Sequence, residues 1–357
     1  MKFVAPFARS AMAVAVMGLS ASALADAKFE RDVEERLAKL EKQQSAKSGS
    51  LLGDKVEFTG VIEIEAALGE GYDDESYSDL AVATVELGIA AQLNDKVNAE
   101  IVLLYEEGET ELDVDTATLS FAGLIGPVDL LIGKQYLPFG RFETALVNDT
   151  LALELAEANK TAALFGMEQD GFSAGVYLFD GSVDREDHVE NYGFTTSYGQ
   201  ENFKFGLDYI SALSESDAVS EEINPQALKS DDGALSLSGS LSLEAVTIIA
   251  EYLTALDDIE YVDTGDQIEV QPEAMQVEVD FAANLSGKEY TFGFALQESD
   301  DAVGLLPESR LSFGGSTSVY ENVSLAVEFW HDEDYDENDG GSGEKSNNVV
   351  VQLAAEF

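Results

Sequence analysis

The chain has 357 residues, with 70 acidic against 19 basic side chains and a formal net charge of −51. Simple repulsion argues against nucleic acid and free polyphosphate as partners, and the absence of Cys excludes disulfides and thiolate metal sites. A hydrophobic content of 45% argues against an acidic disordered chain.

The first residues have the pattern of a secretory signal. Lys2 and Arg9 give a basic start, the run 11–19 is apolar, and Ala23 and Ala25 form a small-x-small cleavage pattern. A membrane anchor helix is the alternative, but the run is well short of the ~20 residues that a spanning helix needs. We therefore interpret residues 1–25 as a signal peptide, which places the mature chain outside the cytoplasm.

A short helix is predicted next, over 28–44. Apolar side chains recur there at steps of four, four and three, at Phe29, Val33, Leu37 and Leu40. This spacing predicts one to two heptads of coiled coil, and a lone amphipathic helix at the mouth of the following domain is the alternative. Residues 26–54 then form a periplasmic coiled-coil helix and its linker.

From Val56 onward the hydrophobic period changes to two, which is typical of strands with one apolar and one polar face. Glutamates fill the polar face of the first strand, where a soluble protein would not bury them. No later run is long enough for a spanning helix, so any membrane span must be a closed barrel of strands. The last strand alternates from Val349 to Phe357 and resembles the C-terminal signal strand of bacterial outer-membrane barrels.

Sixteen such strands are predicted between 55 and 357. Tight turns, such as Asn94-Asp95 and Glu321-Asn322, alternate with long polar connections, such as 214–232 and 257–272. The sequence therefore predicts an all-β membrane barrel of about 16 antiparallel strands, with short periplasmic turns and long outer loops. A barrel of that size leaves an aqueous channel.

The third long connection, between strands near 127–135 and 160–168, combines cations, a Pro-Gly bend and aromatic residues in a chain poor in cations. A loop folded inward would narrow the pore and set its selectivity; an outer cap whose cations pair with nearby carboxylates is the alternative. The candidate constriction residues are Lys134, Gln135, Tyr136, Pro138, Phe139, Arg141 and Glu143.

Acidic side chains on the polar faces of the strands are candidate pore-lining residues. Rings of acids favour cations in a pore, which predicts a mild cation preference, although any water-filled lumen needs polar residues. The candidates are Glu57, Glu63, Glu65, Glu86, Glu100, Glu251, Glu278, Asp280 and Glu328.

Other chemistry is not favoured by the sequence. The two histidines, His188 and His331, lie in or beside predicted outer loops without a catalytic partner, so no enzyme activity is expected. The acidic run 332–340 has oxygen ligands at alternate positions, but Glu337 and Gly343 occupy positions where a calcium loop needs Gly and Glu. We interpret it as a solvated loop, and expect no metal site and no cofactor.

The chain resembles the LbtU-type siderophore porins over essentially its whole length. The runs 133–144, 151–155 and 175–181 carry the resemblance, together with the order of signal, short coiled coil and barrel. It implies an outer-membrane porin of a Gram-negative cell that admits a ferric siderophore by passive diffusion, without a plug domain. The alternatives are a general cation-preferring diffusion porin and a non-conducting structural envelope barrel. Expected partners are outer-membrane lipid and lipopolysaccharide, the barrel assembly machinery, small solutes and two further copies in a homotrimer.

Overall fold

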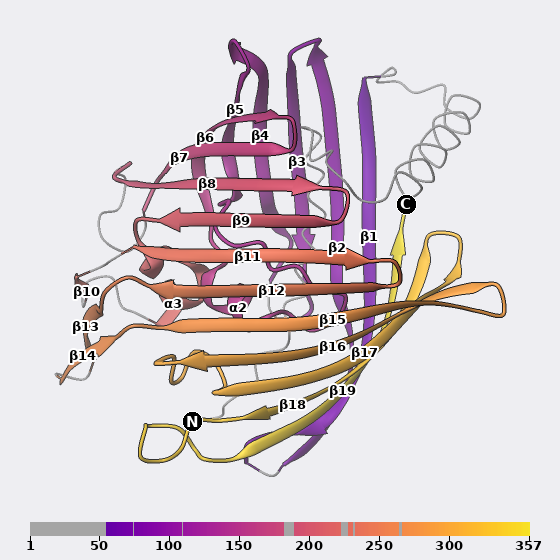
Figure 1. Ribbon diagram of the computed structural model, residues 1–357, viewed down its shortest axis with the longest axis vertical. Coiled ribbons are helices and arrows are strands. Elements are labelled where there is room, and N and C mark those ends of the chain that lie inside the picture. The colour runs from indigo at the N-terminus through magenta and orange to yellow at the C-terminus, as the bar shows by residue number, and fades with distance from the viewer. Residues whose placement is uncertain are drawn as a thin grey trace.

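The wall of the molecule is one closed sheet of sixteen strands (Figure 1). The computed structural model describes residues 55–73, 75–108, 110–181, 189–222, 228–230, 233–263 and 266–357. The wall strands are β1 (Val56–Glu70), β2 (Ser76–Asn94), β3 (Val97–Tyr105), β4 (Asp113–Ile125), β5 (Val128–Tyr136), β6 (Asn159–Gln169), β7 (Phe172–Phe179), β8 (Asn191–Gln200), β9 (Phe203–Ile210), β11 (Ala234–Leu243), β12 (Val246–Ala255), β15 (Glu273–Leu285), β16 (Lys288–Asp300), β17 (Ser309–Tyr320), β18 (Val323–Glu333) and β19 (Lys345–Glu356).

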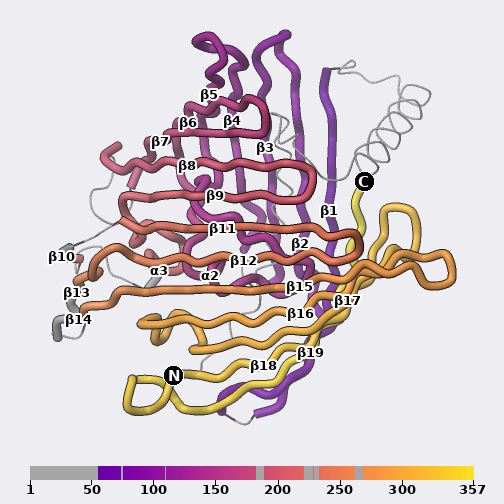
Figure 2. Tube along the Cα trace, in the orientation of Figure 1, coloured from indigo at the N-terminus to yellow at the C-terminus, as the bar shows by residue number. Residues whose placement is uncertain are grey.

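Each wall strand is antiparallel to its neighbours, and the chain follows the wall once around before β19 pairs with β1 (Figure 2). The first and last strands are joined from Val61–Glu356 to Glu70–Asn347, so the sheet has no open edge. Phe357 extends this seam, because its backbone exchanges two hydrogen bonds with Gly60, at 2.7 and 3.0 Å. The predicted barrel of 16 antiparallel strands is therefore confirmed.

The two-residue period separates an outer apolar face from an inner polar one. On β15, for example, Val277 and Phe281 are 46% and 49% exposed, whereas Glu278 and Asp280 are 0% and 7% exposed. Apolar side chains that stay accessible on the outside of a closed sheet are typical of a lipid-facing surface. None of the helices within the described ranges is long and apolar enough to cross a membrane.

Turn residues explain why the strands reverse so tightly at one end of the barrel. Asp170, Glu244, Ser286 and Asn322 all have φ between 53° and 60°. Two-residue hairpin turns need this left-handed conformation because it matches the twist of the flanking strands. The tight turns predicted from the sequence lie at these positions.

The outer connections contain more structure than the sequence indicates. They include α2 (Leu151–Ala156), the 3₁₀ helix η1 (Leu213–Glu215), α3 (Asp217–Glu222) and a separate sheet of β10 (Leu228–Ser230), β13 (Ile259–Asp263) and β14 (Asp266–Val270). The regions 214–232 and 257–272, interpreted as polar loops, thus contribute to this small sheet. The acidic run 332–340 also differs from the predicted solvated loop, because its first residue, Asp332, belongs to β18.

An apolar core lies inside the barrel. Helix α2 contacts β12, β15, β16 and α3, and in Figure 1 both helices lie behind β11, β12 and β15. Leu151 and Leu155 of α2 are fully buried in a cluster with inward side chains of the wall, such as Phe179, Ile210 and Leu253. This part of the lumen is therefore filled by packed side chains.

Gly133 lies in β5, three residues before that strand ends at Tyr136. Its φ is 139°, and a Cβ there would lie 2.0 Å from the carbonyl oxygen of Ala117 and 2.9 Å from the Cα of Thr118. Both atoms belong to backbone, so neither can rotate away. Only glycine fits this position without moving β4 away from β5.

We expect Gly133→Ala to reduce barrel stability by at least about 2 kcal/mol, because backbone strain adds to the steric clash. The loss of stability is measured as the fraction of barrel that stays folded in urea. The gel mobility of unheated samples reports this fraction. Gly166→Ala in neighbouring β6 is the matched control, since its Cβ would meet nothing closer than 3.8 Å. Equal losses in the two variants would contradict the prediction.

The predicted signal peptide, the coiled-coil helix with its linker, and His188 lie outside the described residues. They stay predictions.

Candidate functional site

Residues 137–158 connect β5 to β6 and fold toward the inside of the barrel. The connection starts and ends at the wall, where the Leu137 amide donates to the Ala158 carbonyl at 2.9 Å. Its middle reaches β12, β15, β16 and β18, which lie on a different arc of the barrel from β5 and β6. Phe139 is buried in the interior core. We call residues 137–158 the inner loop.

Three inward carboxylates bind the inner loop, mostly through its backbone amides. Glu251 of β12, Glu278 of β15 and Glu328 of β18 each accept two hydrogen bonds from the loop, and each is at most 3% exposed. We call them the anchor carboxylates. The donors are Arg141 N (2.9 Å) and Phe142 N (2.7 Å) for Glu251, Thr144 Oγ1 (2.7 Å) and Ala145 N (2.7 Å) for Glu278, and Val147 N (2.6 Å) and Asn148 N (2.8 Å) for Glu328.

Amide side chains and glycines complete the seat of the inner loop. Gln297 of β16 accepts from Leu151 N at 2.7 Å, which satisfies an amide at the start of α2. Leu146 lies over Gly293 of β16 and Gly314 of β17, where an added Cβ would come within 2.9 and 2.8 Å of the leucine Cδ2. The two glycines therefore form a hollow that receives one leucine.

Arg310 of β17 ties the second half of the inner loop to the wall. Its Nε donates to Asp332 at 2.8 Å and its Nη2 to the other oxygen of Asp332 at 3.2 Å. Its Nη1 donates to the Asp149 carbonyl at 3.1 Å and to Glu154 at 2.5 Å. The guanidinium is thus shared between β18 and the segment that enters α2, and the geometry with Asp332 is the bidentate one that favours arginine.

Three other inward cations are also paired with acids. Arg141 donates to Asp208 of β9 at 3.0 Å and to Thr195 of β8 at 2.8 Å. Lys204 lies 3.5 Å from Glu143 of the inner loop. Lys160 of β6 lies 3.2 Å from Glu215 of η1. These positive charges are therefore locally neutralised.

The structure corrects the placement of three predicted loop residues, because Lys134, Gln135 and Tyr136 are the last residues of β5. Lys134 shares the outward face with Ile132, and its ammonium donates to the Val114 carbonyl at 2.6 Å. Strand alternation forces this orientation, since Ile132 is two residues away. Gln135 points inward and donates to the Ala162 carbonyl, and the Tyr136 hydroxyl donates to Asp115 at 2.9 Å.

The predicted acids fall into two groups. The first group consists of the anchor carboxylates and of Asp280, which follows Glu278 on the inner face of β15. The inward residues of β1, β2 and β3 form the second, and we call these the wall acids. They are Glu57, Glu63, Glu65, Glu86 and Glu100. Glu65 accepts from Gln352 of β19 at 2.9 Å.

Several residues that shape the site were missed by the sequence analysis. Arg310 carried a usable signal, since it is one of few cations and stands on the polar face of a strand. Thr150 carried another, because it precedes a run of helix formers and its side chain accepts from Leu153 N, which caps α2. Gln297 and Leu146 carry no comparable signal.

Burial raises the pKa of the Asp149 carboxyl well above its ordinary value of 3.8, and Glu154 and Glu157 raise it further, while Arg310 opposes them. Its Oδ2 has no hydrogen-bond partner within the described residues. The folded chain thus holds a proton there that the unfolded chain releases. The free energy of unfolding therefore falls as the pH rises above the ordinary Asp value.

Asp149→Asn is expected to remove this pH dependence, because asparagine stays neutral. The variant should be more stable than the parent at about pH 8 and similar to it at about pH 4. Urea unfolding at the two pH values measures the difference. A stability gain of the same size at both would contradict the assignment.

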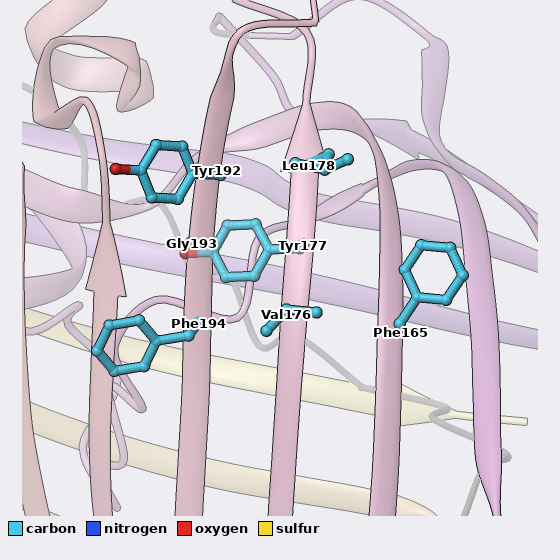
Figure 3. A pocket seen from close by; sticks show the side chains of 7 residues that line it. All are labelled: Phe165, Val176, Tyr177, Leu178, Tyr192, Gly193 and Phe194. Carbon is cyan, nitrogen blue, oxygen red and sulfur yellow. The ribbon is translucent and has the colours of Figure 1, made fainter.

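Two further features do not form sites. An apolar hollow on the outer face of β6, β7 and β8 is lined by Phe165, Val176, Leu178, Tyr192 and Phe194, with Tyr177 and Gly193 beside them (Figure 3). The ring of Tyr177 lies across Gly193, where no Cβ would fit, and its hydroxyl donates to the Tyr209 carbonyl. Within the described ranges, no group of three or more His, Asp and Glu could hold a metal ion.

Comparisons with known proteins give relatives of unknown activity and structural neighbours that are porins. No family model matches the chain. A UPF0422 protein of Coxiella burnetii is 24% identical over 308 residues, which cover 80% of this chain and 65% of that protein. A UPF0422 protein of Legionella pneumophila (strain Lens) is 21% identical over 72% of this chain and 55% of its own length. The chain thus spans between about half and two thirds of the length of these relatives.

The solved structures agree on the fold. An anion-selective porin from Comamonas acidovorans has a TM-score of 0.60 at 12% identity, covering 85% of this chain and 99% of its own. OmpF of Salmonella typhi, solved in complex with daunomycin, has a TM-score of 0.61 at 15% identity, covering 85% and 98%. OprB of Pseudomonas putida has a TM-score of 0.61 at 10% identity, covering 90% and 97%. The chain therefore has the fold of an outer-membrane porin.

Proposed function

We propose that the chain is a channel of the bacterial outer membrane through which small solutes diffuse passively. A closed barrel whose inner loop is hydrogen-bonded across the lumen carries this proposal, since such a loop would narrow a wide barrel and set the size of the solutes that pass. The outward apolar side chains meet lipid, and the inward polar ones meet water. A mild preference for cations follows from the excess of inward acid.

Reconstitution of the purified full chain tests the proposal. In liposomes, neutral sugars of graded size should enter at rates that fall with size, and planar bilayers should show discrete conductance steps. Heat-unfolded protein at the same concentration is the control. Absence of both signals from correctly folded barrel would favour the non-conducting structural barrel.

Ferric-siderophore uptake is the narrower proposal, and it rests on the resemblance of the runs 133–144, 151–155 and 175–181 to LbtU-type porins. Uptake of a labelled ferric siderophore in a deletion strain, compared with uptake of sugars and amino acids, separates it from general diffusion. Selective loss of ferric-siderophore uptake in the deletion strain supports the narrower proposal. Equal loss of uptake of all three solutes would favour the general cation-preferring porin.

The proposed location fixes the expected partners. A secreted barrel would reach the outer membrane through the barrel assembly machinery, for which the strand ending in Phe357 is the candidate signal. Lipid and lipopolysaccharide would surround the apolar belt, and the coiled coil predicted over 28–44 would support a homotrimer with its helices in the periplasm. Native electrophoresis of detergent-extracted protein tests the trimer.

A further inference from the structure

We infer that the cation preference of the proposed channel is set by the wall acids of β1 to β3, chiefly Glu57, Glu86 and Glu100, and not by the anchor carboxylates. The inference rests on the proposed function and names its selectivity-determining residues. The nine acids predicted to line the pore would then have two different roles. One group would position the inner loop, and the other would act on the solute.

The anchor carboxylates are already bonded to the inner loop, although Oε1 of Glu328 has no hydrogen-bond partner within the described residues. Each accepts two hydrogen bonds from the inner loop, and none is more than 3% exposed. Hydrogen bonds to backbone amides offset much of the negative charge, because the amides present their positive ends to it. A passing ion therefore neither reaches these oxygens nor meets their full field.

Three of the wall acids are more accessible than the anchor carboxylates. Glu57 is exposed, and Glu86 and Glu100 are partly exposed, all on the inward face of the wall. Glu63, the next inward position of β1 after the one paired with Glu86, is 1% exposed, and its Oε2 has no hydrogen-bond partner in the described part of the chain. A buried carboxylate oxygen without a partner is unfavourable, so a nearby cation would stabilise it.

The wall strands of this arc carry no fixed cation, and the nearest ones in the sequence, Lys55 and Lys96, lie just before β1 and in the turn between β2 and β3. The sequences of β1, β2, β3 and β4 contain no Lys and no Arg. The inward cations Arg141, Lys160, Lys204 and Arg310 come from other parts of the barrel, and each is paired with an acid there. The charge of the wall acids is thus left for mobile cations to balance.

Helix α2 packs mainly against β12, β15 and β16, which are not neighbours of β1 to β3 in the strand order. In this inference solutes pass between the inner loop and the strands that carry the wall acids. Hydrocarbon outside the wall has a low dielectric constant, which focuses the field of a few charges into the path. We therefore expect small cations, including organic ammonium ions, as the favoured solutes.

The test compares two triple variants in planar bilayers with a KCl gradient. We expect the wall variant to lower the potassium-to-chloride permeability ratio by roughly threefold or more, because the negative electric field along the solute path weakens. This variant combines Glu57→Gln, Glu86→Gln and Glu100→Gln. Sugar entry into liposomes should keep its size limit. The same exchange at Glu251, Glu278 and Glu328 should lower the ratio less than the wall variant does. Because Glu251 and Glu278 accept with both oxygens and glutamine keeps only one, sugar entry is measured in parallel to detect any release of the inner loop.

A charge-matched control removes three acids from the tight turns, with Asp95→Asn, Glu201→Gln and Glu321→Gln, and should keep the parent ratio. The inference is overturned if the wall variant keeps the parent reversal potential, if the anchor variant alone abolishes selectivity, or if the parent conducts without cation preference. A parent that does not conduct at all would refute the proposed function itself.

Discussion

Replacing the anchor carboxylates Glu251, Glu278 and Glu328 by alanine is expected to widen the channel. The triple variant removes the acceptors of six hydrogen bonds, at 2.6 to 2.9 Å, that hold residues 141–148. A hydrogen bond to a charged group contributes about 1.5–3 kcal/mol, so together these bonds outweigh any other contact of this segment. Alanine, unlike glutamine, leaves no acceptor at all.

The alanine variant should release only residues 141–148 of the inner loop. Leu151 stays bonded to Gln297, and α2 stays in the interior core, so the second half of the inner loop has its own support. We expect faster amide exchange at 141–148 only, larger single-channel conductance, and entry of sugars that the parent excludes. Alanine replacement of Glu57, Glu86 and Glu100 is the matched control and should keep the parent size limit. An unchanged size limit in the anchor variant would show that the loop does not depend on these carboxylates.

The barrel could be predicted from the sequence because its wall obeys a simple rule. Lipid outside and water inside impose strict alternation on every strand, and tight turns need residues such as Asp170 and Asn322 that tolerate positive φ. Number, direction and order of the wall strands follow from this. The small sheet of β10, β13 and β14 was missed because its strands are short and lie in polar connections.

The candidate site was less predictable, for two different reasons. The outward orientation of Lys134 was readable from Ile132, two residues earlier on the same strand, but the cluster of cations was taken as a loop signal instead. The role of Glu278 was not readable. Local sequence shows that it points inward, but whether it meets water or the backbone of residues 144 and 145 depends on the path of a loop more than 130 positions away.

Arg310 is expected to give the largest loss of stability of any single side chain in the site. It is 7% exposed and bonds to Asp332, Glu154 and the backbone of Asp149. Arg310→Met keeps a similar apolar volume but leaves Asp332 buried without its cation. Removing one partner of a buried ion pair typically costs about 3–5 kcal/mol. Urea unfolding of the reconstituted barrel, followed by gel mobility, measures the loss.

Two comparisons separate loss of the ion pairs from loss of packing. Adding Asp332→Asn and Glu154→Gln to Arg310→Met removes the stranded charges, and should recover most of the stability because a neutral buried cluster has no uncompensated charge. Lys345→Met breaks the exposed pair with Glu333, whose lysine is 57% exposed, and should cost less than about 1 kcal/mol. If the triple variant were no more stable than Arg310→Met, packing of the guanidinium stem, and not its charge, would be what joins the inner loop to β17 and β18.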